Sequence, residues 1–544
     1  MDARALSAGD VAVLPLPDGS SAACLVTSAD DGRVSVCALD WQSAHPPTVA
    51  ELAQAQPLRL DHHLFTGRRA HHTVRATEEV PPSFDWIGRV PVPGPVRERP
   101  NSYSSWAVLA RDVIGQRRWD RLDPAVRAAY RAVLSGPSHV DLDFGAGTVT
   151  LDPRRTTALD LSDGTIPLPA TGDPGWSALD RLARCTAVTW RGADRGLTAA
   201  LAARPIITRL TWTDPPGSVD LSGTGLTDLT IRGRLPVQLR LPPGCDGLGL
   251  EPGTPAGCEG VGLESGRPAG CEGVGLESGR PAGYDGLGLE PGTPGPGSCT
   301  VAADAAGRWL SLRLAVTDAE PVPLIPDGLE AVREVRVLAA GTASVASLAP
   351  LAELEQLTVH FRKPPGRLVG ADTLAGHGRL TVLTINDAYA LGVGTLPDLP
   401  ALTRLEIDGV RRSVATGLRS RYRRTGTRLV VRGAKTDIWL AANLDNPLRD
   451  WVDDDARGGA AACEAYADAL RAIAELPVGG PERREQAIGV LHTMITRLNA
   501  IDAKHEMIDT LRREEACEAF VDLAGRAGIP PTAANDMCDN WRDW

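Results

Sequence analysis

The hexapeptide "LTVLTI" at residues 380–385 decides how the middle of this chain is expected to fold. Its larger apolar residues, Leu380, Leu383 and Ile385, stand at the first, fourth and sixth positions. Alternation over the last positions buries every second side chain of a β-strand, and the leading leucine turns inward from the bend before it. The hexapeptide therefore predicts a short strand with one buried face and one exposed face.

The same frame recurs along the middle of the sequence. Copies start at residues 185, 207, 226, 245, 258, 271, 284, 309, 332, 354 and 402, and a degenerate copy starts at residue 426. In the second half of this region the strands follow one another every 22 to 26 residues. One such unit cannot hide its own apolar face, so the pattern predicts units that stack on one another.

This frame and its spacing resemble the LxxLxL strands of leucine-rich-repeat proteins, here of a bacterial, actinobacterial type. The resemblance implies a leucine-rich-repeat solenoid over residues 138–436, with Asn386 at the family's asparagine position. Most other units lack that asparagine. The resemblance also implies that the side chains between the buried ones form one continuous binding surface on the concave face of the sheet.

A Gly-rich unit, "CEGVGLESGRPAG", stands twice at residues 258–283, inside a run of short 13-residue repeats over residues 245–297. The four units begin with Cys245, Cys258, Cys271 and Tyr284, in the position that Leu, Ile or Val takes elsewhere. A position that accepts both cysteine and tyrosine indicates a need for apolar volume. A thiolate metal site is the alternative, which Tyr284 interrupts. We expect narrow additional coils without a site of their own.

The N-terminal region alternates apolar and polar residues around turn signals, which is typical of a meander of short strands. The motifs "GDVAVLPLPDG" at residues 9–19 and "WIG" at residues 86–88 resemble immunity protein family 26. The resemblance implies a small β-barrel-like domain over residues 1–95 and an association with contact-toxin systems. A helical connector is predicted over residues 96–137, where Asp123 precedes Pro124 as a helix cap.

Residues 437–544 are predicted to form a helical domain. The apolar residues of one predicted helix recur at helical spacing and indicate one buried stripe: Ile488, Leu491, Met494, Ile495 and Leu498. The predicted fold class is thus a multi-domain α+β protein with a small β-barrel-like domain, a central leucine-rich-repeat solenoid and a C-terminal helical domain.

The formal net charge of −11 argues against a general nucleic-acid-binding protein, whose phosphate contacts require a basic surface. The ten cysteines include no CxxC pair and are widely spread, which predicts free thiols rather than a disulfide framework. No apolar run is long enough for a membrane span, and no signal-peptide pattern opens the sequence. A cytoplasmic protein is therefore expected.

Three segments of the sequence could be sites for ions. The pairs His62–His63 and His71–His72 could offer metal ligands, although a solvated loop is the simpler interpretation. The stretch "DDDARGGAAACE" from Asp453 resembles a calcium loop, but Arg457 stands at a ligand position, which favours acidic residues ahead of a helix beginning near Ala460. The arginine-rich segment at residues 411–428 could bind phosphates or be a solvated helix.

Phosphate-loop, zincin, hydrolase-elbow and strand-borne dinucleotide motifs do not occur, so we expect no enzymatic activity, no metal and no cofactor. We predict a scaffold protein that binds a protein partner through the exposed side chains of its strands. An immunity protein that neutralises an effector is the alternative, and an enzyme of unrecognised type is a second one. The expected contact residues are Arg209, Thr211, Thr230, Arg240, Arg313, Arg336, Thr358, His360, Thr384, Asn386, Arg404 and Glu406.

Three of these arginines, Arg240, Arg313 and Arg336, occupy the same position of their strands, between the last two buried residues. They predict a cationic stripe that would meet an acidic patch on the partner. The sequence leaves the oligomeric state open.

Overall fold

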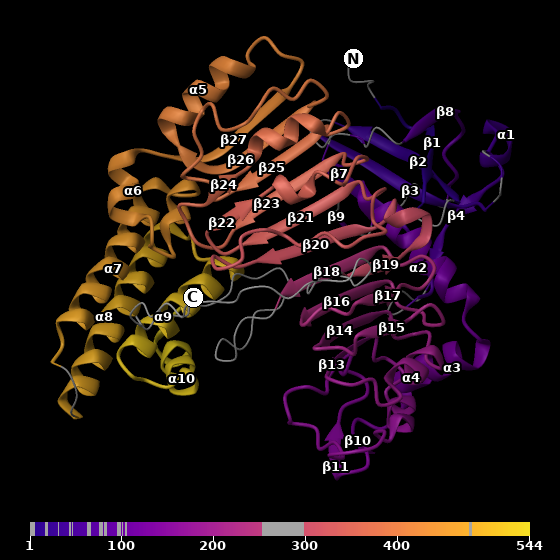
Figure 1. The fold of residues 1–544 in the computed structure, drawn as a ribbon, viewed down its shortest axis with the longest axis horizontal. Helices are drawn as coiled ribbons and strands as arrows, with labels where there is room; N and C mark the ends of the chain where they lie inside the picture. Colours follow the sequence, from indigo (N-terminus) through magenta and orange to yellow (C-terminus); the bar gives the residue numbers. More distant parts are fainter. Residues whose placement is uncertain are drawn as a thin grey trace, which may run out of the picture. The chain divides into compact units, whose positions relative to one another are not determined.

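The structure is a computed structural model (Figure 1). It describes residues 6–16, 20–30, 32–42, 45, 47–62, 67–75, 80, 84–94, 100, 102–103, 106–252, 299–477 and 481–544. The predicted short coils headed by Cys258, Cys271 and Tyr284, and His63, lie outside these residues. The chain divides into two compact units. The first comprises residues 1–249, 299–311 and 327–329, and the second comprises residues 250–298, 312–326 and 330–544.

The predicted fold class is wrong. The chain has a mixed α/β fold with an 11-stranded parallel sheet, and its described residues form neither a closed barrel nor a solenoid. The strands that the LxxLxL frame predicted within the described residues are present, because alternating burial is a local property of a strand. A repeat fold would also require equivalent segments between the strands, and here these segments differ from one to the next.

The first unit begins with a seven-stranded sheet of mostly antiparallel strands. Its order is β8-β1-β2-β3-β7-β9, with β4 beside β3, and β8 does not pair with β9, so the sheet is open rather than barrel-like. The strands are β1 (Asp10–Pro15), β2 (Ser21–Asp30), β3 (Arg33–Asp40), β4 (Gln56–Pro57), β7 (His71–Arg75), β8 (Asp85–Arg89) and β9 (Ser102–Tyr103). A helical turn, α1 (Val49–Leu52), and the pair β5 (Arg59–Leu60) and β6 (Arg68–Arg69) lie in its loops.

Helix α2 (Ala107–Arg121) packs on this sheet and completes its core. Trp106, Leu109 and Val113 belong to the same buried cluster as Leu14, Val26 and other strand residues. Helix α3 (Pro124–Ala132) follows, with Asp123 capping Ala125 N–H at 2.7 Å, as the sequence predicted. The N-terminal sheet therefore uses residues well beyond position 95 for its core.

The 11-stranded sheet runs in the order β12-β13-β14-β16-β18-β20-β21-β23-β25-β26-β27. Its strands are β12 (Ala158–Asp160), β13 (Ala187–Arg191), β14 (Arg209–Thr213), β16 (Asp228–Gly233), β18 (Gly247–Pro252), β20 (Ser311–Val316), β21 (Glu334–Ala339), β23 (Gln356–Phe361), β25 (Val382–Asn386), β26 (Arg404–Arg411) and β27 (Arg428–Lys435). Leu383 and Ile385 are buried with 0 % exposure while their neighbours are partly exposed, as the quoted hexapeptide predicted.

The segments between these strands are varied. They contain the helices α4 (Leu197–Ala202) and α5 (Arg412–Tyr422), and short 3-10 helices at Trp176–Arg181, Asp304–Gly307, Ala346–Leu348 and Ala371–Gly376. They also contribute two small sheets: β15 (Ser218–Asp220) with β17 (Gln238–Arg240) and β19 (Thr300–Ala302), and β22 (Thr342–Ser344) with β24 (Arg367–Val369). The hairpin of β10 (Val140–Asp143) and β11 (Thr148–Leu151) precedes β12 in the chain.

The second unit ends in helices, as expected from residue 437 onward. They are α6 (Asp437–Asn443), a 3-10 helix at Arg449–Asp453, α7 (Ala456–Glu475), α8 (Pro481–His505), α9 (Thr510–Arg526) and α10 (Pro531–Trp541). The predicted stripe on α8 is confirmed: Leu491, Met494, Ile495 and Leu498 are at most 1 % exposed, and Ile488 packs against the same core. Within the described part of the chain, no helix has both the length and the apolar character to cross a membrane.

Candidate functional site

The predicted contact residues divide between the two units. Eleven of them lie on strands of the 11-stranded sheet, whereas Arg240 lies on β17 of the separate β15-β17-β19 sheet. In the first unit, Thr211 and Thr230 are aligned on neighbouring strands, but Thr230 is buried. In the second unit the remaining eight fall on β20, β21, β23, β25 and β26: Arg313, Arg336, Thr358, His360, Thr384, Asn386, Arg404 and Glu406.

Five parallel strands of the second unit align these side chains in rows. Arg336, Thr358, Thr384 and Glu406 are register partners, followed by Val430, and we call these five residues the central row. A parallel row holds Leu338, His360, Asn386, Asp408 and Arg432. All ten are exposed or partly exposed, because their strand neighbours take the buried positions. The rows thus form one polar, rigidly spaced surface.

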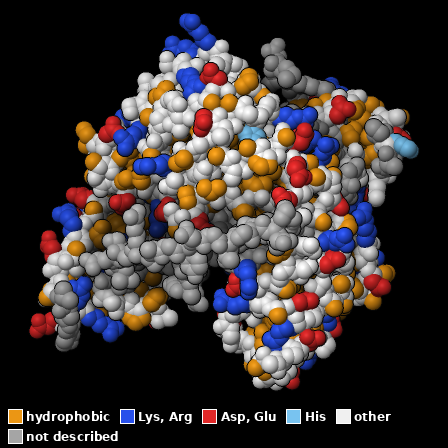
Figure 2. Space-filling model, in the orientation of Figure 1, with side chains coloured by type: hydrophobic (Ala, Val, Ile, Leu, Met, Phe, Trp, Pro, Cys, Tyr) orange, Lys and Arg blue, Asp and Glu red, His pale blue; other side chains and the backbone are white. Residues whose placement is uncertain are grey.

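The predicted cationic stripe is not what this surface presents. Arg336 pairs with Glu334 at 2.8 Å, and Arg404 Nε donates to Glu406 at 2.9 Å, so each of these arginines has a carboxylate on its own strand. Arg240 lies 3.7 Å from Asp220 in its separate sheet. On the face of the molecule seen in Figure 2, basic and acidic side chains are interspersed. Mixed charge, rather than positive charge, characterises the central row and its neighbours.

In six of the strand repeats, a residue with a left-handed backbone conformation (positive φ) stands at the same position. Gly192, Asp214, Gly233, Asp387, Gly409 and Gly433 all have positive φ and stand two residues after the last apolar residue of the strand frame. At Gly409 a Cβ would lie 3.0 Å from the Asp387 Cα, so the close approach of the chains requires glycine there. This recurrence of Asp or Gly is visible in the sequence two residues after the frame, outside the apolar positions that define the frame.

Asp387 uses this turn to place its carboxylate beside a buried arginine. Arg449 Nη2 lies 2.7 Å from Asp387 Oδ1 and 3.6 Å from Asp450, and the Arg449 side chain is only 6 % exposed. Burial alone would lower the pKa of Arg449, but the carboxylates of Asp450 and Asp387 outweigh it and raise that pKa above its usual value. Burial, with the charge of Asp450 second, also raises the pKa of the neighbouring Tyr389.

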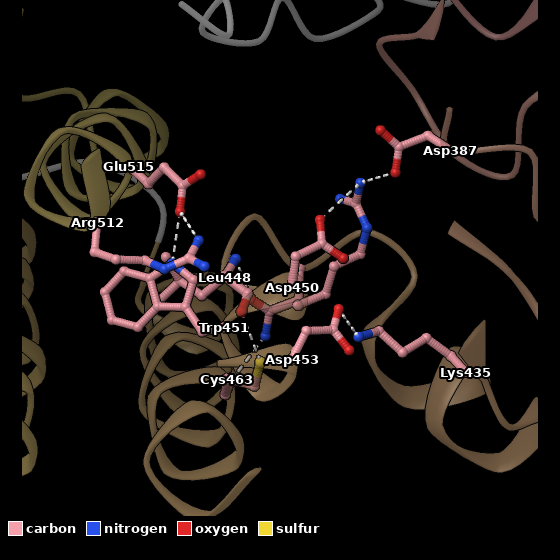
Figure 3. Close-up of polar contacts among 11 residues, drawn as sticks. Asp387, Lys435, Leu448, Asp450, Trp451, Asp453, Cys463, Arg512 and Glu515 are labelled. Atoms are coloured by element: carbon pink, nitrogen blue, oxygen red, sulfur yellow. Dashed lines mark hydrogen bonds and ion pairs between the residues drawn. The ribbon is translucent and has the colours of Figure 1, made fainter. Parts of the chain in front are cut away.

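The segment that carries Arg449 is held from two sides (Figure 3). On the sheet side, Lys435 at the end of β27 pairs with Asp453, and Asp387 pairs with Arg449. On the helix side, Trp451 Nε1 donates to Glu515 at 2.6 Å, and Arg512 contacts both Glu515 and Asp454. We call Asp387, Lys435, Arg449, Asp450 and Asp453 the Arg449 cluster. Each cation in it faces a carboxylate, so its arrangement is that of a structural clamp on the Arg449–Asp453 turn.

The calcium-loop alternative is resolved by the same contacts. Asp455 caps α7 by accepting hydrogen bonds from Arg457 N–H at 2.9 Å and Gly458 N–H at 2.6 Å, and these bonds lower the pKa of its carboxyl. The helix begins at Ala456, four residues before the predicted start. Asp453 is taken by Lys435. Among the described residues, no group of three or more His, Cys, Asp or Glu side chains is placed to hold a metal ion.

His62, His71 and His72 are buried, which corrects the interpretation of these described histidines as part of a solvated loop. His71 and His72 are buried on β7, where they point to opposite faces. His71 Nε2 is 2.8 Å from the Thr27 hydroxyl, and His72 Nε2 is 2.7 Å from Asp112 on α2. The first contact joins β7 to β2 within one sheet, and the second joins the sheet to α2, so both have a structural rather than a metal-binding arrangement.

The arginine-rich segment forms helix α5 and the start of β27. Arg421 is engaged by Asp398 at 2.6 Å and by the Leu396 carbonyl oxygen at 2.7 Å. Arg412, Arg419, Arg423 and Arg424 are exposed. This agrees with a largely solvated helix whose buried face is Ala415, Leu418 and Tyr422.

No protein-family model matches the chain, and no curated protein matches it.

Proposed function

We propose that this chain is a non-enzymatic protein-interaction module that binds a protein partner through the central row and its neighbours on β21, β23, β25 and β26. The observation that carries the proposal is the register itself. Arg336, Thr358, Thr384 and Glu406 stand side by side on successive strands, about 4.8 Å apart, on a face whose backing is a fully buried core. A rigid array of this kind can recognise a surface with little loss of side-chain freedom on binding.

The chemistry of the array favours a polar partner surface. Hydroxyl and amide groups from Thr358, Thr384 and Asn386 offer both donors and acceptors, and they stand between the ion pairs of Arg336 and Arg404. An acidic patch on the partner would have to compete with Glu334 and Glu406 for these arginines, so charge complementarity would serve specificity more than affinity. We place the module in the cytoplasm, since its eight described cysteines are free thiols.

The experiment enlarges the centre of the array without changing its charge. In the double variant Thr358→Tyr and Thr384→Tyr, two aligned, half-buried threonines gain bulk that a strand accepts, while the contact surface is blocked. Affinity capture from the native cell, followed by titration of the purified partner, should show binding weakened by at least about tenfold, or 1.4 kcal/mol.

A matched control exists on the three-stranded parallel sheet β15-β17-β19. Ser218 and Gln238 are also aligned on neighbouring strands and are exposed, so Ser218→Tyr with Gln238→Tyr adds the same bulk elsewhere. The control should bind as the unaltered chain does. If both double variants bind the partner equally well and their circular dichroism spectra are unchanged, the central row and its neighbours are not the binding surface.

A further inference from the structure

Two cysteines of the C-terminal helices lie within reach of each other. Cys517 on α9 and Cys538 on α10 have their sulfur atoms 3.2 Å apart, and the Cys538 thiol donates to Cys517. Arg542 Nη1 donates to the Cys517 sulfur at 3.3 Å. Cys538 is buried at 1 % exposure, whereas Cys517 is partly exposed. One cysteine of the pair is thus partly exposed, and the other is buried against it.

The surroundings of Cys517 favour its thiolate. The hydrogen bond from Cys538, together with the Arg542 guanidinium, lowers the pKa of Cys517 to about 7 against the opposing effects of burial and of Asp539. Arg542 and Asp539 also pair with each other at 2.7 Å. Burial instead raises the pKa of Cys463, in the same helical region, to about 12. These surroundings thus favour a thiolate at Cys517, whereas burial disfavours one at Cys463.

The packing of α10 against α9 maintains this arrangement. Trp541, three residues after Cys538, packs edge-on against Phe520 at 5.9 Å between ring centroids, and Phe520 is three residues after Cys517. A disulfide requires sulfur atoms about 2.05 Å apart, so the two sulfurs need to approach by only about 1 Å. Side-chain rotation within a fixed helix pair covers a distance of that size.

We propose that Cys517 and Cys538 form a redox-modification site that hydrogen peroxide converts to a disulfide. The Cys517 thiolate attacks one peroxide oxygen, so that an S–O bond forms, the O–O bond breaks and hydroxide leaves. Cys538 then attacks the sulfur of this sulfenic acid; the S–S bond forms, the S–O bond breaks, and the Cys538 proton leaves with the hydroxyl as water. The hydroxide takes up the proton that the Cys517 thiol released on ionisation, so that overall two thiols are oxidised and one hydrogen peroxide is reduced to two waters.

The second step is helped by the first. While Cys517 is a thiolate, the hydrogen bond to it and its negative charge raise the pKa of Cys538 and hold its proton. Oxidation of Cys517 to a neutral sulfenic acid removes that charge and frees Cys538 to react. The disulfide would tie the last helix of the described chain to α9.

The test uses the reduced, full-length chain and equimolar hydrogen peroxide at pH 7, with unreduced peptide mapping by mass spectrometry. We expect one linked peptide pair, Cys517 with Cys538, lighter by two hydrogen atoms than the separate thiols. In the Cys538→Ser variant, Cys517 should stop as a sulfenic acid that dimedone traps, whereas Cys463→Ser should form the disulfide as the unaltered chain does.

Iodoacetamide labelling supplies a readout that does not depend on oxidation. The labelling rate of Cys517 should rise with a midpoint near pH 7 and exceed that of Cys463 at pH 7 by more than about tenfold. The proposal is overturned if the linked pair does not form, if the unaltered chain accumulates as much dimedone adduct as Cys538→Ser, or if Cys517 is labelled no faster than Cys463.

Discussion

Arg449 shows how one residue can determine the geometry of its surroundings. Its guanidinium is buried between two carboxylates: Asp387, which is 62 positions away in the sequence, and the adjacent Asp450. A buried ion pair contributes little net stability, because desolvation offsets its attraction, yet removal of one partner leaves the other uncompensated. The Arg449 cluster is thus better understood as fixing a position than as a source of stability.

Substitution of Arg449 by leucine should therefore be far more damaging than removal of an exposed arginine. We expect Arg449→Leu to lower the free energy of unfolding by about 3 kcal/mol, because Asp387 and Asp450 lose their counter-charge in a largely dry site. The side chain of Arg336 is 62 % exposed, so Arg336→Ala should lower the free energy of unfolding by less than about 1 kcal/mol. Urea denaturation followed by tryptophan fluorescence measures both. Similar losses in the two variants would show that Arg449 is not the organising cation.

At the scale of the element, two helical glycines provide a matched pair. Gly459 in α7 lies against the Trp451 and Val452 backbone, which a Cβ would strike, whereas Gly489 in α8 has open space around it. Alanine is the better helix former by about 0.5–1 kcal/mol, so Gly489→Ala should stabilise the chain by that amount. Gly459→Ala should destabilise it, since the turn that carries Arg449 has to shift. Thermal unfolding checks the sign of each change, and stabilisation by Gly459→Ala would contradict the close contact.

The strands could be predicted from sequence, but their surroundings could not. Alternation at Leu383 and Ile385 is local, so it predicts the strand and its buried face. The pattern around Arg240 looks the same locally, yet its strand belongs to a different sheet, because sheet membership depends on the segments between strands. The Asp387–Arg449 pair joins residues 62 positions apart, and no local pattern connects them.

The charge of the surface could not be predicted from the frame for a related reason. Arg313 and Arg336 share a position in the frame, whereas the sign of a surface depends on which charged side chains lie beside each arginine. Glu334 stands two residues before Arg336 on the same face of β21 and pairs with it. Because side chains two residues apart lie on the same face of a strand, the alternation that predicts buried residues also predicts such same-face neighbours.

At the scale of the whole molecule, the position of a domain boundary decides which fragments can fold. A boundary at residue 95 separates the N-terminal sheet from Trp106, Leu109 and Val113, which are at most 2 % exposed in its core. It also removes β9, which pairs with β7, and Asp112, which binds His72. The connector predicted over residues 96–137 is therefore part of this domain's structure rather than a spacer.

Two fragments test this boundary. Fragment 1–137 retains the buried side chains that α2 contributes and the Trp119–Tyr130 contact at 5.2 Å between α2 and α3. It should give a dispersed amide spectrum by NMR and unfold cooperatively. Fragment 1–95 loses several large apolar side chains, each worth about 1.5–3 kcal/mol when buried, which exceeds the margin by which a small domain is stable. It should show the narrow amide dispersion of an unfolded chain. A well-dispersed spectrum from fragment 1–95 would instead mean that the sheet is stable without α2, and that the helix covers a core already formed.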